Sequence, residues 1–228
     1  MAQRRNPEIS GRDNSQRIDV TVKSGAGKSP FDADVFTNER DGSVNIANVA
    51  VDRHVVDGHA DQVALIWLGK DGDRRELTFG DLKDLSCRFA SVLRDHGLAK
   101  GDSVFVLMGR VPELYACALG TLRAGMVFTP LFSAFGPEPI RTRMEIGGAK
   151  VLVTTAAIYK RKIAEWRDQL NSLKLVLIVG EDAPEGCVAL GPDLAAASPD
   201  FAPVHTAPAD PALIHFTSGT TGKPKGAL

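Results

Sequence analysis

Short, continuous apolar runs alternate along this chain with longer segments that have helical periodicity. The apolar runs, which predict strands, are 104–108, 126–131, 151–154, 173–179 and 212–216. The segments between them place apolar residues at three- and four-residue spacing, which predicts helices over 80–96, 112–124, 137–146 and 158–170. Strands that alternate with helices of about ten or more residues pair in parallel, because each crossover packs a helix on the sheet. The pattern therefore predicts an α/β fold with a mainly parallel sheet and helices on both faces.

The part of the chain before residue 104 predicts a different arrangement. Residues 1–42 are polar and aperiodic, and we expect them to be largely irregular. A helix is predicted from Ile46 to about Asp57, followed by a β-hairpin with strands over 63–68 and 76–79. Near the other end, residues 181–211 are rich in Pro, Ala, Asp and Gly and predict a long connection. Residues 43–228 are thus expected to form the folded portion.

Composition excludes several classes of partner. The 228 residues are 43% hydrophobic and carry 27 basic and 28 acidic side chains, so a net charge of −1 favours neither nucleic acid nor a membrane surface. Residues 1–17 lack the apolar core of a signal peptide, and no apolar run approaches the roughly 20 residues of a membrane span. Cys87, Cys117 and Cys187 are isolated, as expected of reduced thiols in a cytoplasmic protein, and no histidines pair at metal-ligand spacing.

The most chemically informative segment follows the last apolar run. Residues 212–216 lead directly into Thr217, Ser218, Gly219, Thr220, Thr221, Gly222 and Lys223, and then into Pro224, which we expect to end regular structure. Glycines let backbone N–H groups approach phosphate oxygens, while the hydroxyls and Lys223 add further donors. A surface loop has the same composition, so residue types alone leave both possibilities open. The position at a strand end favours phosphate, since α/β sheets bind ligands there.

Neither of the chain's glycine–lysine segments is a Walker A loop. That loop requires Ser or Thr after the lysine, and here Pro224 follows Lys223. Residues 25–29 read Gly-Ala-Gly-Lys-Ser, but Val22 stands where the first glycine of the pattern belongs. We expect residues 25–29 to belong to a solvated N-terminal segment.

The sequence T-S-G-T-T-G-K-P-K-G at 217–226 resembles the phosphate-loop signature of the adenylate-forming superfamily, which includes acyl-CoA synthetases, peptide-synthetase adenylation domains and luciferases. The resemblance implies that residues 217–223 hold the β- and γ-phosphates of ATP while a carboxylate attacks the α-phosphate. Residues 45–47, 51–54, 63–67 and 77–82 are similar to the entry segment of acetyl-CoA synthetases, the AMP-forming acetate–CoA ligases. Residues 122–131 resemble the second core motif of the superfamily, and residues 131–138, followed by Arg143 and by 149–155, resemble the acetyl-CoA synthetases again. Arg123 stands where the superfamily usually has lysine. Taken by themselves, residues 51–54 also fit a helix surface with one ion pair, and 122–131 fits packing.

This resemblance implies a two-step ligase reaction that uses ATP, Mg²⁺ and CoA. A carboxylate and ATP give acyl-AMP and pyrophosphate, and the CoA thiol then displaces AMP. Acetate is the expected substrate. Propionate or another short- or medium-chain acid stays open, as do a non-catalytic nucleotide-binding role and a chain without a ligand that serves as an interaction domain or is a decayed remnant. Residues 43–228 would be an incomplete N-terminal portion of the AMP-binding domain. The catalytic lysine is expected beyond residue 228, so the chain alone is expected to be inactive.

The resemblance also implies where CoA binds. Lys160 stands where acetyl-CoA synthetases use an arginine for the 3′-phosphate of CoA, and Ile163 stands at the second arginine of that region. Ala134 stands where a glycine approaches the CoA nucleotide. Taken by themselves, residues 160–162 favour a solvated helix face. Arg110, at a predicted strand end, could contact a phosphate or cap the preceding strand.

Overall fold

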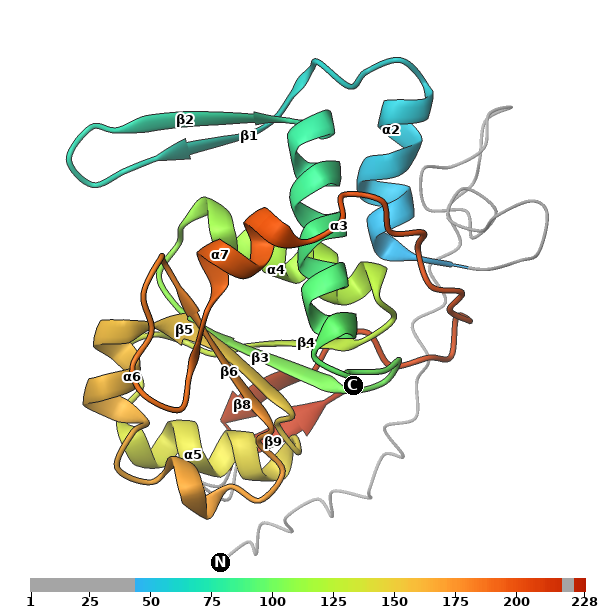
Figure 1. Cartoon of the computed structure of the whole chain (residues 1–228). Coiled ribbons are helices and arrows are strands. Elements are labelled where there is room, and N and C mark those ends of the chain that lie inside the picture. The colour runs from blue at the N-terminus through green and yellow to red at the C-terminus, as the bar shows by residue number, and fades with distance from the viewer. Residues whose placement is uncertain (1–43, 219–223) are drawn as a thin grey trace, which may run out of the picture. The chain divides into compact units, whose positions relative to one another are not determined.

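The computed structural model of the chain describes residues 44–218 and 224–228. The segment predicted to be irregular, including residues 25–29, therefore lies outside the described residues. The described elements, shown in Figure 1, are in chain order η1 (Asn48–Asp52), α2 (Arg53–Val56), β1 (Val63–Leu68), β2 (Arg74–Thr78), α3 (Phe79–Asp95), β3 (Ser103–Leu107), α4 (Pro112–Arg123), β4 (Val127–Pro130), α5 (Pro137–Ile146), β5 (Val151–Thr155), α6 (Ala156–Lys162), η2 (Arg167–Gln169), β6 (Leu175–Val179), β7 (Val188–Ala189), α7 (Leu190–Ala196), β8 (His215–Ser218) and β9 (Pro224–Ala227).

A parallel five-stranded sheet with the order β4-β3-β5-β6-β7 forms the centre of the fold. Residues 212–214 extend it beyond β4, because Phe128 N donates to Ala212 O (2.9 Å) and Ile214 N donates to Phe128 O (3.1 Å). Every residue of β3 is buried, as expected of a central strand covered on both faces. The predicted α/β fold with a parallel sheet is confirmed.

Alternate residues of the central strands supply two separate cores. Val104 and Val106 of β3 pack in one cluster with residues of α3, α4 and α7. Phe105 and Leu107 of the same strand pack in the other with residues of α5 and α6. This division follows from the two-residue period of a strand, which turns successive side chains to opposite faces. Helices therefore cover both faces of the sheet, as predicted (Figure 1).

The N-terminal elements also follow local sequence signals. Strands β1 and β2 form the predicted antiparallel hairpin. Helix α3 begins with a capping box, in which Asp81 N donates to Thr78 Oγ1 (3.1 Å) and Thr78 N donates to Asp81 Oδ2 (2.8 Å). It ends before Gly97, whose φ of 77° suits a residue without a Cβ. Local capping chemistry therefore sets both ends of this helix.

The ion pair expected on the surface of residues 51–54 is instead buried. Asp52 accepts two hydrogen bonds from Arg123, from Nη2 to Oδ1 (2.6 Å) and from Nη1 to Oδ2 (2.8 Å). The Arg123 side chain is 1% exposed and that of Asp52 is 10% exposed. Arg123 Nε also donates to Ser86 Oγ (3.2 Å). The pair ties η1 to α3 and α4, so the surface interpretation of Asp52 was wrong.

Three other expectations about secondary structure were wrong in part. The helix expected over 158–170 ends at Lys162, whose carbonyl accepts a hydrogen bond from Trp166 Nε1 (2.7 Å), and a short 3₁₀ helix follows. The connection 181–211 contains β7 and α7, which are too short to produce a periodic signal. Pro224 does not end regular structure but begins β9, a position where a strand tolerates a missing N–H.

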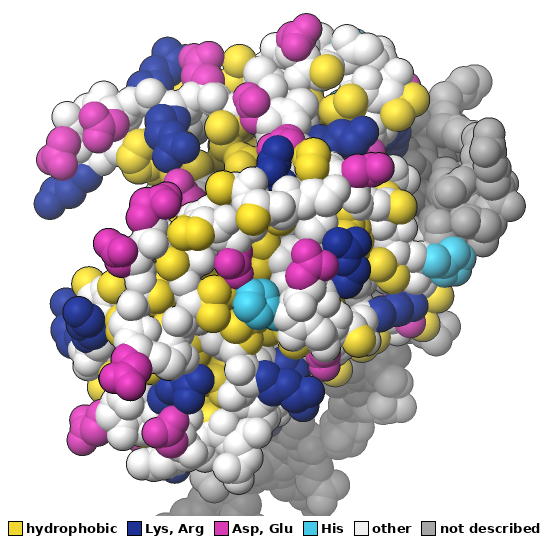
Figure 2. Space-filling view, viewed as in Figure 1, with side chains coloured by type: hydrophobic (Ala, Val, Ile, Leu, Met, Phe, Trp, Pro, Cys, Tyr) yellow, Lys and Arg dark blue, Asp and Glu magenta, His cyan; other side chains and the backbone are white. Residues whose placement is uncertain are grey.

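Charged side chains of both signs are interspersed on the face of the molecule seen in Figure 2. That distribution agrees with the near-zero net charge. In the part of the chain that the structure describes, no helix has both the length and the apolar character needed to cross a membrane.

Candidate functional site

The segment with the phosphate-loop sequence starts at the carboxyl edge of the parallel sheet. Leu213 lies opposite Phe128, two residues before β4 ends at Pro130. Strand β8 therefore continues past the end of β4, and it returns as β9 in an antiparallel hairpin. Thr217 is exposed, and residues 219–223 lie outside the described residues. Of the predicted phosphate-binding residues, the structure thus places Thr217 and the backbone of Ser218 at the edge where such sheets bind ligands.

Phe216 anchors this hairpin to the rest of the fold. Its ring centroid lies 6.3 Å from that of Phe105, a buried residue of β3. Gly226 faces it across the hairpin, and a Cβ at this glycine would lie 3.3 Å from Phe216 Cε1. The close approach of the ring to the β9 backbone favours glycine there. The residue immediately before Thr217 is therefore fixed by packing on both sides.

The loop over residues 131–136, between β4 and α5, carries the candidate Ala134. Ala134 is exposed at the turn of this loop. Lys162, on α6, donates from Nζ to Ser133 O (2.6 Å) and to Phe135 O (2.7 Å), one on each side of Ala134. A single ammonium group thus ties the loop to the helix that also carries Lys160. This role of Lys162 was not predicted, because a lysine at the end of a short basic run gives no local sign of its partner.

The three residues considered for CoA binding differ in exposure: Lys160 and Ala134 are exposed, and Ile163 is buried. Lys160 is exposed on α6, as a phosphate ligand would have to be. Ile163 is wholly buried in the core on the α5–α6 face, so it offers no charge at the second arginine position. Ala134 and Lys160 therefore lie on two segments joined by Lys162, while position 163 serves packing.

Arg143 of α5 connects the same loop to β8. Its Cζ lies 4.3 Å from the ring centroid of Phe135 and 5.9 Å from that of Phe216. Nη1 donates to Pro139 O (2.8 Å), whereas the buried Nε has no hydrogen-bond partner among the described residues. A cavity of about 640 Å³ lies beside this contact, with Phe135, Arg143 and Pro224 in its wall. An isolated arginine in an amphipathic helix gives no sequence signal for such an environment.

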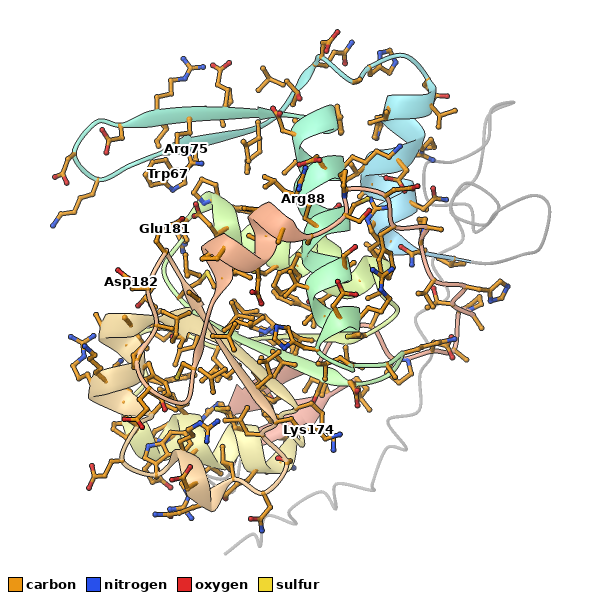
Figure 3. All side chains as sticks on the ribbon, viewed as in Figure 1. Trp67, Arg75, Arg88, Lys174, Glu181 and Asp182 are labelled. Atoms are coloured by element: carbon orange, nitrogen blue, oxygen red, sulfur yellow. The ribbon has the colours of Figure 1, made fainter. Side chains whose placement is uncertain are left out.

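Arg110 follows β3 at the point where the strand order reverses. Its carbonyl accepts a hydrogen bond from Trp67 Nε1 (2.6 Å), and the neighbouring Glu113 pairs with Arg75 (3.3 Å). Trp67 and Arg75 belong to the β1–β2 hairpin and lie together in Figure 3. The backbone of Arg110 therefore helps to dock the hairpin on the start of α4.

Cys117 and Tyr159 have the largest pKa shifts among the described residues, and burial is the main cause of both. Burial raises the pKa of Cys117, a core residue of α4, and Glu113 adds to the shift. Burial also raises the pKa of Tyr159 on α6 to about 12, and a hydrogen bond with Cys187 contributes. No group of three or more His, Cys, Asp or Glu side chains suited to a metal ion occurs among residues 44–218 and 224–228. The raised pKa values of Cys117 and Tyr159 therefore reflect their burial in the core.

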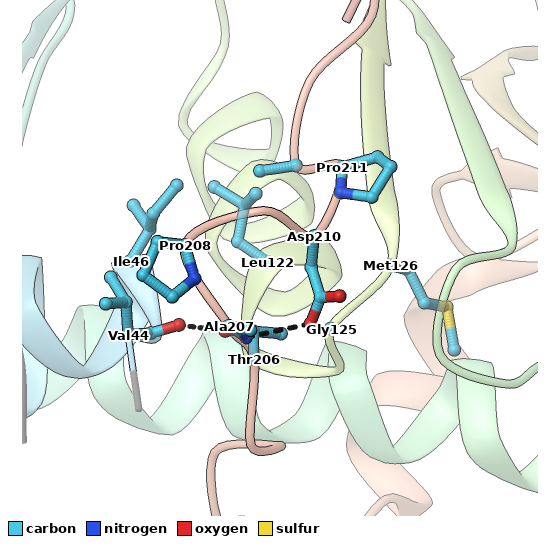
Figure 4. Close-up of a pocket in the computed structure, with 11 residues that line it drawn as sticks. Val44, Ile46, Leu122, Gly125, Met126, Thr206, Ala207, Pro208, Asp210 and Pro211 are labelled. Atoms are coloured by element: carbon cyan, nitrogen blue, oxygen red, sulfur yellow. Dashed lines mark hydrogen bonds between the residues drawn. The ribbon is translucent and has the colours of Figure 1, made fainter. Parts of the chain in front are cut away.

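A smaller cavity of about 110 Å³ lies at the opposite end of β4, near the start of that strand (Figure 4). Its wall is mainly apolar, and Asp210 beside it accepts a hydrogen bond from Ala207 N (2.8 Å). The pKa of Asp210 is lowered by a hydrogen bond from Lys100 and by this backbone donor. The aspartate stabilises the turn that leads into residues 212–214.

Comparison with known proteins agrees with this arrangement. A family model described as AMP-binding enzyme matches residues 52–228. The acetyl-coenzyme A synthetase of Bacillus subtilis is 39% identical over 191 residues, which are 82% of this chain and 32% of that protein. The acetyl-coenzyme A synthetase of Syntrophobacter fumaroxidans is 34% identical over 245 residues, or 98% of this chain and 37% of that protein.

Solved structures show the same likeness. An acyl-CoA synthetase from Brucella canis superposes with a TM-score of 0.76 at 36% identity, over 86% of this chain and 35% of that one. An acetoacetyl-CoA synthetase from Streptomyces lividans shares the fold, with a TM-score of 0.72 at 24% identity, over 81% of this chain and 30% of that one. The chain spans about a third of the length of these proteins. The resemblance seen in the sequence is confirmed, and the chain belongs to the AMP-binding enzyme family.

Proposed function

We propose that this chain forms the ATP-phosphate side of an AMP-forming acyl-CoA ligase, with acetate as the favoured carboxylate. The observation that carries the proposal is the phosphate-loop sequence after β8, a strand that extends past the carboxyl edge of the parallel sheet. The ligase would join ATP and a carboxylate into acyl-AMP and pyrophosphate. CoA would then take the acyl group and release AMP.

Residues 217–223 are proposed to bind the β- and γ-phosphates of ATP. The first step brings a carboxylate toward a polyphosphate, so the repulsion between two anions must be offset by oriented donors and positive charge. Backbone N–H groups at Gly219 and Gly222, the hydroxyls of Ser218, Thr220 and Thr221, and the Lys223 ammonium supply them. When bound, Mg²⁺ would neutralise phosphate charge. Hard oxygen ligands suit this ion, and here the hydroxyl residues and the phosphates themselves offer them.

Lys160 and Ala134 are proposed to contact CoA. The exposed Lys160 ammonium would meet the 3′-phosphate as a point charge, without the paired donors of an arginine. The exposed Ala134 lies in a loop whose two flanking carbonyls are held by Lys162, so the nucleotide would meet a tethered surface. We also propose a cytoplasmic location, where the three free cysteines remain reduced.

The test of the phosphate site is titration of the purified chain with MgATP in a calorimeter. Lys223→Ala removes the proposed charge, and Lys225→Ala is the matched control because Lys225 is exposed on β9 only two residues away. Loss of a charged hydrogen bond predicts at least about tenfold weaker binding for Lys223→Ala, and little change for Lys225→Ala. If both variants bind MgATP equally weakly, the effect comes from the net positive charge and not from a specific contact of Lys223. If the wild-type chain does not bind MgATP, the proposed phosphate site is refuted.

Catalysis is tested separately by acetate-dependent ATP–pyrophosphate exchange. We propose that the chain alone binds ATP without exchange, because the proposed site residues contact the β- and γ-phosphates and CoA, and none of them contacts the carboxylate or the α-phosphate. Robust exchange would contradict that part of the proposal. If the wild-type chain does exchange, replacing acetate with propionate in the same assay distinguishes the two carboxylates.

The CoA contact is tested by comparing CoA with 3′-dephospho-CoA. Lys160→Ala should weaken binding of CoA several-fold and leave 3′-dephospho-CoA unaffected, since only CoA carries the proposed partner of Lys160. Arg161→Ala, an exposed cation one residue along α6, is the control. An equal effect of both variants on both ligands would contradict a specific phosphate contact.

A further inference from the structure

The guanidinium of Arg143 lies between two aromatic rings that belong to different functional segments. Phe135, 4.3 Å from Arg143 Cζ, ends the loop that carries Ala134. Phe216, 5.9 Å from the same atom, lies on β8 just before Thr217. Helix α5, which carries Arg143, also packs against β9. The arginine therefore contacts both segments from a single position.

The two rings and one backbone carbonyl are the contacts that the structure gives the Arg143 guanidinium. Among the described residues it has no carboxylate partner, Nη1 donates only within α5 to Pro139 O, and the buried Nε has no hydrogen-bond partner. A partly desolvated cation without a counter-ion is costly. The negative faces of aromatic rings compensate for part of that cost. The two rings thus stabilise the arginine, and the arginine draws the rings toward one another.

Each ring is also fixed on its far side. Phe135 meets the edge of Phe132 (5.5 Å between centroids), and its carbonyl is held by Lys162. Phe216 packs against Phe105 of the sheet. No hydrogen bond or ring contact joins Phe135 directly to Phe216 in the part of the chain that the structure describes. Arg143 therefore supplies a direct side-chain connection from the loop to β8, in addition to the core cluster against which both rings pack.

We propose that Arg143 is a positioning residue that couples the 131–136 loop to β8. It acts through Phe135 and Phe216 and contacts neither ligand itself. The consequence rests on the proposed function: the CoA-side loop and the ATP-phosphate side would influence each other's order, and by thermodynamic linkage the influence is equal in both directions. The coupling is carried by identified contacts along a continuous path from α6 through the loop and α5 to β8.

The first experiment needs no ligand. Hydrogen–deuterium exchange is measured by mass spectrometry on the wild-type chain and on Arg143→Met, Arg143→Lys and Arg141→Met. Arg143→Met should raise exchange in peptides from the loop and from β8 together, by about five- to thirtyfold in the opening equilibrium. Arg143→Lys keeps the cation but loses the planar stack, so its effect should be intermediate. Arg141→Met removes an exposed cation from the same helix, one paired with Glu145, and should change neither segment.

A second comparison separates coupling from simple loss of stability. Phe135→Leu changes only the loop side of the contact, and we expect it to raise exchange in β8 when Arg143 is present. The same substitution should add nothing in the Arg143→Met background, because the connection is already lost. Equal effects of Phe135→Leu on β8 in both backgrounds would overturn the proposal, as would unchanged exchange of β8 in Arg143→Met.

MgATP titration then links the positioning role to the proposed site. Arg143→Met should weaken MgATP binding about fivefold or more, Arg143→Lys should recover part of the affinity, and Arg141→Met should match the wild type. Wild-type affinity in Arg143→Met would overturn the coupling to the phosphate side. If the wild-type chain fails to bind MgATP, the proposed function fails, and the exchange measurements still decide whether Arg143 joins the loop to β8.

Discussion

Replacing Asp52 with Asn removes the charge that neutralises Arg123 and almost nothing else. The asparagine has nearly the same shape and keeps one acceptor oxygen, while Arg123 stays 1% exposed. Its remaining partners are the neutral acceptors Ser86 Oγ (3.2 Å) and Phe201 O (3.4 Å). A buried cation is thereby left without a counter-ion, and breaking such a pair costs about 3–5 kcal/mol. Because a domain is stable by only about 5–15 kcal/mol, this is a large part of the total.

Urea denaturation, followed by circular dichroism, measures the effect. With a urea m value of about 3 kcal/mol/M, the upper end of the range for small proteins, a loss of about 3–5 kcal/mol lowers the midpoint by about 1–1.7 M. Glu145→Gln breaks the exposed Arg141–Glu145 pair, which has a similar distance (2.8 Å), and should cost less than about 0.5 kcal/mol. The double variant Asp52→Leu/Arg123→Met should be more stable than Asp52→Asn, since no unpaired charge remains. Equal midpoint shifts in Asp52→Asn and Glu145→Gln would show that the buried pair contributes no more to stability than the exposed one.

Three further predictions concern the packing of the cores. Gly120→Ala should destabilise the chain by about 1–3 kcal/mol in the same urea assay. The added Cβ would lie 2.8 Å from both Phe89 Cδ1 and Ser86 O, where α4 crosses α3. Gly136→Ala, whose Cβ would have room, is the control. Tyr159, left as the sole tyrosine in Tyr115→Phe, should titrate with a pKa of about 12 by ultraviolet absorbance, against 10.0 unperturbed. As the pH rises, Tyr159 loses its phenolic proton in the unfolded chain before it does so in the folded chain. Its contribution to the free energy of unfolding should therefore be constant below pH 10 and decline between pH 10 and 12. Titration of the folded chain near pH 10 would contradict the burial argument. Iodoacetamide should alkylate the half-buried Cys187 well before Cys117, whose thiol is buried and has a raised pKa, and equal rates by peptide mapping would show that the α4 core opens.

The sequence predicted those parts of the fold that local rules determine. Helix α5 has its expected bounds because Pro137 begins it and Gly147 follows it, and β3 was recognisable because a continuous apolar run needs cover on both faces. Helix α7 and β7 were missed because they are held by long-range contacts: Leu190 is buried in the core, and Gly191 N donates to Gly180 O (2.9 Å). Period-based prediction requires several turns, and seven residues supply only two.

The candidate site shows the same division. The phosphate-loop sequence and the strand before it could be predicted, because the residue types at 217–226 and their position after an apolar run point to the same kind of segment. The contacts of Lys162 and Arg143 could not be predicted, because each acts on a segment distant in sequence: Lys162 bonds to Ser133 O 29 residues earlier, and Arg143 meets Phe216 on β8. The buried partnership of Asp52 and Arg123 spans 71 residues and was equally invisible. A charged residue in a helix usually faces solvent, and only tertiary structure identifies the exceptions.

The geometry of β8 explains the position of Arg143. The chain joins the sheet in parallel at Leu213 and then forms an antiparallel pair with β9 from His215 onward. From that point β8 no longer has β4 as a hydrogen-bonded neighbour, so its position must come from side chains. Phe216 supplies that contact to the sheet through Phe105 and to α5 through Arg143. A segment that extends beyond its sheet needs such lateral support, and here an arginine near two rings, rather than near a carboxylate, supplies part of it.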